Sequence, residues 1–137
     1  MNEYKILEKL KVKMLEQKHS GFNMGAVVLD KKGCALNYGF NSYVKTHTRM
    51  LYNPMYNCEQ IFVHAECDAI YGVNYKVEPH TIIVCRLNRR GEYMIAKPCQ
   101  GCYLEIKKAN IKKIYYTNES GELTLIDSRL TVEEYGK

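Results

Sequence analysis

Two short motifs constrain this chain more than any other feature of its sequence. His64-Ala65-Glu66 opens one apolar helical pattern, and Pro98-Cys99-Gln100-Gly101-Cys102 opens a later one. Together they supply an imidazole, two thiols and a carboxyl group. Imidazole nitrogen and thiolate sulfur are the ligands that zinc prefers, and three protein ligands leave the fourth tetrahedral position for water. The motifs therefore predict a fold in which two neighbouring helix starts converge on one metal ion.

Glu66 distinguishes a catalytic site from a purely structural one. It stands two residues after His64, close enough to reach water at the open metal position without being a ligand, and it can take up a proton and return it. The alternatives are a structural zinc site, a disulfide or redox pair, and unrelated core residues. A structural site would need a fourth ligand, and a lone Cys-x-x-Cys can be a redox pair. Neither of these accounts for both Glu66 and Pro98.

The two motifs resemble the metal-site signature of the zinc-dependent cytidine and deoxycytidylate deaminase superfamily. The resemblance implies that zinc (Zn2+) is the cofactor and that His64, Cys99 and Cys102 are its ligands. It also implies that Glu66 is the catalytic proton shuttle in the hydrolysis of an exocyclic amine.

Hydrophobic periodicity and turn signals predict an α/β chain. We expect helices over 2–19, over 64–73 and from Pro98 onward, strands over 22–29, 34–38, 81–85, 111–117 and 123–126, and a peripheral tail over 127–137. The resemblance covers about Gly25 to Tyr116 and implies a three-layer α/β/α cytidine-deaminase-like fold around a mixed five-stranded sheet.

The last two predicted strands carry information about the substrate. Only the turn Asn118-Glu119-Ser120-Gly121 and its neighbours separate them, and parallel strands need a crossover of a dozen residues or more, so we expect an antiparallel pair. In the resembled superfamily this ending is typical of free-nucleoside cytidine deaminases and some bacterial toxin deaminases. His-Ala-Glu at residues 64–66 is more typical of deoxycytidylate, tRNA and polynucleotide deaminases, so the sequence mixes two patterns.

Substrate contacts are predicted within the long segment that precedes His64 and on both sides of it. The resemblance implies that Asn41 holds the sugar or base and that backbone groups near Ala65 hold the base edge; the alternative for Asn41 is an ordinary turn residue. Lys45, His47 and Arg49 form a cationic cluster that could bind a phosphate group, or could belong to a solvated loop.

Length and composition set the remaining expectations. The chain has 137 residues, which suits a single domain over 1–137, and its net charge of +5 would attract phosphate-bearing partners. Its apolar runs are too short to span a bilayer and its first residues lack the apolar core of a signal peptide, so we expect a cytoplasmic protein without membrane contact. We also expect a homo-oligomer. Apart from the two proposed ligands, Cys34, Cys58, Cys67 and Cys85 are read mostly as buried thiols.

These observations favour one function and leave two others open. The first hypothesis is a hydrolase that converts cytosine to uracil in a free nucleoside or nucleotide, such as cytidine, deoxycytidine or deoxycytidylate. The second is a deaminase of cytosine or adenine in single-stranded DNA or RNA, which must admit an unpaired base. The third is a zinc-stabilised binding module without turnover, which Glu66 disfavours.

Overall fold

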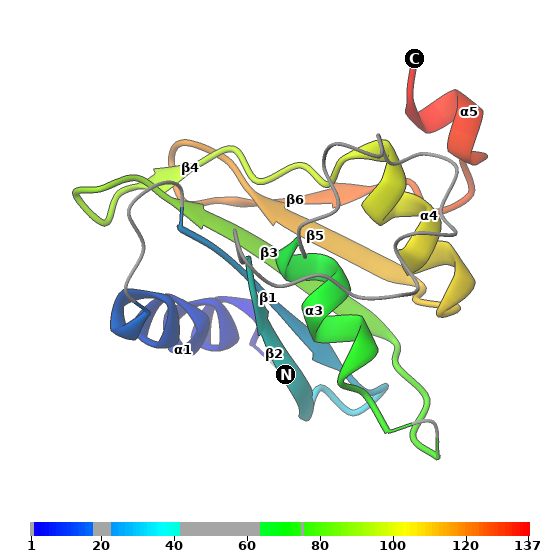
Figure 1. The fold of residues 1–137 in the computed structure, drawn as a ribbon, viewed down its shortest axis with the longest axis horizontal. Helices are drawn as coiled ribbons and strands as arrows, with labels where there is room; N and C mark the ends of the chain where they lie inside the picture. Colours follow the sequence, from blue (N-terminus) through cyan, green and yellow to red (C-terminus); the bar gives the residue numbers. More distant parts are fainter. Residues whose placement is uncertain (1, 18–22, 42–63, 75) are drawn as a thin grey trace.

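The computed structural model describes residues 2–17, 23–41, 64–74 and 76–137. Its elements, in chain order, are α1 (Glu3–Glu16), β1 (Asn23–Leu29), β2 (Ala35–Phe40), α3 (Ala65–Tyr71), β3 (Thr81–Leu87), β4 (Tyr93–Met94), α4 (Gln100–Lys108), β5 (Lys113–Thr117), β6 (Leu123–Ile126) and α5 (Val132–Tyr135). Figure 1 shows these elements as one sheet with helices packed against it. The predicted α/β class is confirmed.

The sheet is mixed, with strand order β2-β1-β3-β5-β6, and β4 pairs with β3 beside this path. β3 and β5 are parallel because α4 lies in the crossover between them, and the other pairs are antiparallel. The predicted antiparallel final pair is confirmed, with Ile114 opposite Ile126 and Thr117 opposite Leu123. The five predicted strands are present; the two-residue strand β4 is an addition that the sequence pattern did not predict.

One face of the sheet is covered by α1. Leu7, Leu10 and Met14 recur at three- and four-residue spacing, and all three are buried. They pack against side chains of β1 and β3, namely Val27, Leu29, Ile83, Cys85 and Leu87. The helix ends at Glu16, a little before the predicted end at residue 19.

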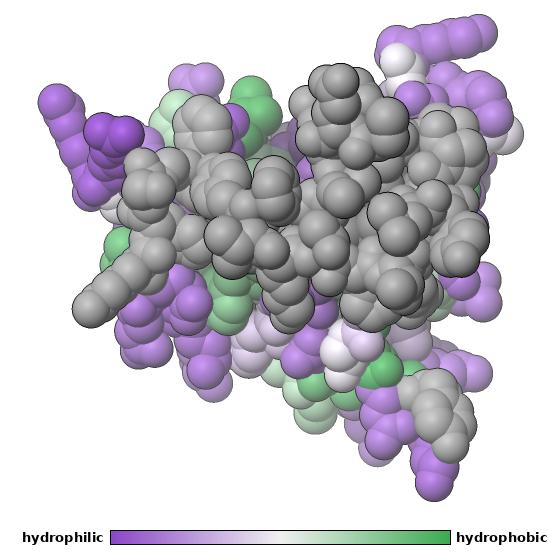
Figure 2. Space-filling model, viewed as in Figure 1, coloured by the Kyte–Doolittle hydropathy of each residue, from purple (hydrophilic) through white to green (hydrophobic). Residues whose placement is uncertain are grey.

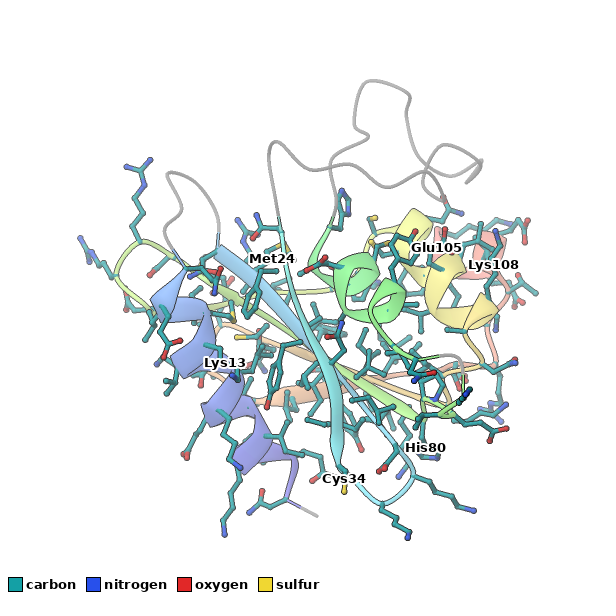
Figure 3. All side chains as sticks on the ribbon, turned by 60° about the horizontal axis from the view of Figure 1, so that its bottom comes forward. Lys13, Met24, Cys34, His80, Glu105 and Lys108 are labelled. Atoms are coloured by element: carbon teal, nitrogen blue, oxygen red, sulfur yellow. The ribbon has the colours of Figure 1, made fainter. Side chains whose placement is uncertain are left out.

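The opposite face is covered by α3 and α4, which completes the three predicted layers. Their buried side chains include Ala65, Ala69, Ile70, Tyr103 and Ile106, and these join Val28, Ile82, Val84 and Ile114 of the sheet in one apolar cluster. Figure 3 shows α1 on one side of the sheet and the α3–α4 pair on the other. Because each strand of the centre is buried on both faces, its sequence reads as a nearly continuous apolar run.

The C-terminal residues differ from the predicted peripheral tail. They include α5, whose N-cap Thr131 forms a capping box with Glu134, and Tyr135 at its end is only 7% exposed. Figure 1 shows α5 lying against α4. Pro98 also differs from its predicted place in the first turn of a helix, because α4 begins at Gln100 and Pro98 precedes it.

Hydrophilic residues dominate the described part of the surface shown in Figure 2. Within the described ranges, every helix is too short or too polar to cross a membrane.

Candidate active site

The starts of α3 and α4 carry the two sequence motifs. His64 is the N-cap of α3 and Glu66 lies in its first turn, while Cys99 is the N-cap of α4 and Cys102 lies in its first turn. Both N-caps have extended backbone conformations, which turn the chain into each helix. Because the two helices pack side by side on one face of the sheet, their first turns meet.

The predicted metal ligands converge. His64 Nδ1 lies 3.2 Å from Cys102 Sγ and 3.6 Å from Cys99 Sγ, and the candidate ligand atoms of the three residues all lie within 4.8 Å of one another. The same ring nitrogen therefore faces both sulfurs. One imidazole and two thiols suit zinc, and a set of three leaves room for a further ligand.

Electrostatics within the chain already favour a thiolate at this point. The side-chain hydrogen bond with Cys102 is the largest of several causes that lower the pKa of Cys99 to about 4. The hydrogen bond with Cys99 is the main cause that raises the pKa of His64 to about 9, whereas burial raises the pKa of Cys102. Cys99 Sγ also accepts from the Cys102 amide at 3.5 Å. In the metal-free chain these shifts favour a thiolate on Cys99 paired with a protonated His64, and the imidazole would release its proton on binding a metal ion.

Glu66 is the anomalous residue of the site. Its side chain is 1% exposed, and its Oε1 atom has no hydrogen-bond partner within the described ranges. Burial is the main cause that raises the pKa of its carboxyl group. A buried polar atom without a partner is costly, so native proteins supply one from a water, an ion or a ligand. The residues present therefore fit a metal site with a bound polar group next to Glu66.

Comparison with known proteins agrees with this geometry. A family model described as the cytidine and deoxycytidylate deaminase zinc-binding region matches residues 2–118, a range that includes both motifs. The chain belongs to this family. It is a zinc-dependent deaminase of the cytidine deaminase type, and Zn2+ is its cofactor.

Other comparisons add less. A solved structure of a mutant cytidine deaminase from Mycobacterium tuberculosis matches 80% of this deaminase and 83% of its own chain, with 14% sequence identity and a TM-score of 0.49. No curated protein matches the sequence.

The helix that carries His64 and Glu66 is held in the deaminase by close contact with β2. A Cβ atom placed on Gly39 would lie 2.2 Å from the Ala69 nitrogen, so only glycine allows the strand to approach this closely. Asn37 Nδ2 donates to the carbonyl oxygens of Asp68, at 3.3 Å, and Ala69, at 2.9 Å. Asp68 Oδ2 accepts from the Phe40 amide at 3.0 Å. These contacts fix α3 relative to the sheet edge.

A group of buried and half-buried polar side chains behind the donors was not singled out from the sequence. Cys67 Sγ lies 3.8 Å from Cys102 Sγ, and the Tyr71 hydroxyl donates to Glu105 Oε1 at 3.1 Å. Figure 3 places Glu105 where α3 and α4 face each other. The four-residue spacing of Cys67 and Tyr71 was a signal for a shared helix face, but nothing local indicated Glu105 as a neighbour. Of the other thiols, Cys85 is buried as expected, Cys34 is exposed, and Cys58 lies outside the described residues.

The predicted substrate contacts are placed only in part. Asn41 directly follows β2, and its Oδ1 accepts from the Met24 amide at 2.9 Å, which ties it to β1. Ala65 is the first residue of α3 and is buried. Lys45, His47 and Arg49 lie outside the described residues. All five substrate contacts therefore stay predictions.

A cavity of about 660 Å³ lies away from the donors. Its walls come from the C-terminal ends of α3 and α4, where Ile70 and Ala109 lie, and from His80 and Lys112, which precede β3 and β5. The donors lie at the opposite ends of the same two helices, so this cavity is separate from the chemistry.

Proposed function

We propose that this deaminase hydrolyses the exocyclic amine of cytosine in a free nucleoside or nucleotide, giving uracil and ammonia. In this proposal His64, Cys99 and Cys102 hold zinc, and Glu66 carries the proton. The observation that carries it is Glu66 Oε1, a buried carboxyl oxygen without a protein partner in the described ranges, beside a three-donor group. A binding module would gain nothing from an acid in this position.

The residues divide the reaction between them. Bound zinc supplies Lewis acidity, which makes water a nucleophile near neutral pH. Glu66 takes one proton from the attacking water and passes it to N3 of the base. It then takes the second proton from the hydroxyl group added at C4 and passes it to the leaving amine. One C–O bond forms at C4, the C–N bond breaks, and water and the amine become a carbonyl and ammonia. Because Glu66 is buried, it makes these transfers shielded from bulk solvent.

The same proposal assigns the substrate contacts. Asn41 holds the sugar or base, and backbone groups at Ala65 hold the base edge. Lys45, His47 and Arg49 bind the phosphate group if the substrate is a monophosphate. The antiparallel pair β5–β6 supports a free nucleoside or nucleotide, since this ending is typical of the free-nucleoside enzymes in the superfamily.

We further expect one domain over 1–137, a homo-oligomer, and a cytoplasmic location. Size-exclusion chromatography with light scattering measures the oligomeric state directly. A monomer at working concentration would contradict that expectation without affecting the chemistry.

A substrate panel tests the proposal. Zinc-loaded protein is incubated with cytosine and adenine as bases, nucleosides, mono- and triphosphates and single-stranded oligomers, and conversion of amine to carbonyl is scored by mass. We expect conversion of a free cytosine nucleoside or nucleotide, and conversion that is slower by orders of magnitude with the E66Q variant. Conversion only inside oligomers would replace this proposal with the nucleic-acid alternative, and binding without ammonia release would replace it with the binding module.

A further inference from the structure

The turn that presents both cysteines is contacted by residues far from it in the sequence. Pro98 is buried and precedes the N-cap Cys99, so its carbonyl lies outside the hydrogen-bond ladder of α4, whose first acceptor is the Cys99 carbonyl. A buried carbonyl needs a donor from elsewhere. That donor is the Tyr135 hydroxyl, at the end of α5.

Aromatic stacking fixes where Tyr135 lies. Its ring stacks on the ring of Tyr103, with centroids 3.9 Å apart and planes 2° from parallel. Tyr103 directly follows Cys102, so the stack sets α5 against the first turn of α4. Gln100, between the two cysteines, adds a second link by donating from Nε2 to the Val132 carbonyl at 2.9 Å.

The segment before α5 is anchored to α4 by two other side-chain groups, the Tyr103 hydroxyl and the Lys107 ammonium. The Tyr103 hydroxyl donates to the Leu130 carbonyl at 2.7 Å, and Lys107 Nζ donates to the carbonyls of Ser128, at 2.8 Å, and Leu130, at 3.0 Å. These bonds hold the segment to the helix but do not touch the cysteine turn. The Tyr135 hydroxyl is different because it acts on the turn itself.

We propose that Tyr135 is a positioning residue for the metal donors, through its hydroxyl bond to the Pro98 carbonyl and its stack on Tyr103. The inference rests on the ligand set of the proposed function. It concerns a part of the chain beyond residue 118, where the match to the family model ends. Groups that orient metal ligands without touching the metal commonly change metal affinity by about 10- to 100-fold when they are removed.

The test compares Y135F with Y103F. Each variant removes one hydroxyl from the same stacked pair, but only Y135F removes the bond to Pro98. Zinc affinity is measured by competition with a chromophoric chelator, and the thermal midpoint is measured without metal. We expect Y135F to bind zinc about tenfold more weakly and Y103F to stay within about twofold of the parent protein. The metal-free midpoints of the two variants should fall by similar amounts, since each loses one hydroxyl-to-carbonyl bond.

Steady-state kinetics provide a second measurement. A residue that positions the metal should lower kcat of Y135F and leave KM within about twofold, because substrate contacts are unchanged. If Y135F does not fold, Q100M tests the same docking of α5 on the cysteine turn, since it removes the Gln100–Val132 bond. It should weaken zinc binding, and unchanged zinc affinity would overturn the inference.

The outcomes separate this inference from the proposed function. Equal zinc affinity in Y135F and Y103F would show that Tyr135 only anchors the C-terminal segment, and would overturn the inference alone. Retention of stoichiometric zinc by C99A would instead overturn the ligand set and the proposed function with it.

Discussion

The two helices that meet at the donors are held in place by different means. α3, with His64 and Glu66, is fixed by main-chain contact with β2 at Gly39, inside the region that the family model matches. α4, with both cysteines, is fixed at its start by a tyrosine from beyond that region. The positions of His64 and Glu66 thus depend on a glycine at residue 39, where a methyl group would not fit. The positions of the two cysteines depend on the hydroxyl group of Tyr135.

The largest effect on zinc content and turnover is expected when a cysteine at the start of α4 is replaced. C99A removes a donor and the N-cap of α4, so we expect loss of stoichiometric zinc and of measurable turnover. Metal content by elemental analysis checks this. C34A is the matched control, because Cys34 is exposed and belongs to the β1–β2 turn; it should keep both zinc and activity.

Substitution of Glu66, on α3, should lower turnover without lowering zinc content. E66Q keeps the shape of the side chain but cannot carry a proton, so turnover should fall by about 10²- to 10⁴-fold while zinc content stays unchanged. The thermal midpoint should not fall, since burial disfavours the charged carboxylate that the amide replaces. Near-normal turnover would remove Glu66 from its assigned role.

The contact between β2 and α3 can be broken with one methyl group. G39A places Cβ against the main chain of α3, 2.2 Å from the Ala69 nitrogen, so the helix must shift and unfolding should become easier by about 1–3 kcal/mol. Chemical denaturation measures this. G72A is the comparison, because its Cβ would meet the Asn37 side-chain amide and disturb its two hydrogen bonds to α3 without pressing on the main chain; its loss of stability should be smaller. Equal losses of stability in G39A and G72A would mean that the main-chain contact at Gly39 contributes no more than the side-chain contact at Gly72.

The smallest effect is expected at the capping box of α5. T131A removes the side chain that accepts from the Glu134 amide at 3.1 Å, so α5 should open more easily by about 1 kcal/mol. Hydrogen exchange at the Tyr135 amide, which donates to the Thr131 carbonyl, reports this opening. S120A, in the β5–β6 turn, should leave that exchange rate unchanged.

Each half of the proposed donor set could be recognised from local sequence, and the resemblance to the deaminase superfamily joined the two halves into one predicted site. Two cysteines three residues apart at a helix start must share a face, and an imidazole two residues before an acid leaves few other interpretations. The final strand pair was predictable for the same reason, since a short turn permits only one orientation.

The remainder could not be predicted because it depends on contacts between distant residues. No local pattern relates Tyr135 to Pro98, or Gly39 to Ala69, and the two-residue strand β4 is too short to show alternation. The helix α5 was not predicted, although Thr131-Val132-Glu133-Glu134 carries the capping-box pattern. With only four residues, it is too short to show a helical repeat of apolar residues, so residues 127–137 read as a tail.

The sulfur of Cys99 has two roles in this proposal, since it accepts from the Cys102 amide and is also one of the three proposed metal donors. Any change in the electron density of that sulfur is therefore felt by an amide proton. In a nitrogen-15 correlation spectrum of isotope-labelled protein, the Cys102 cross-peak becomes a built-in indicator of cation loading, and it needs no dye, chelator or substrate.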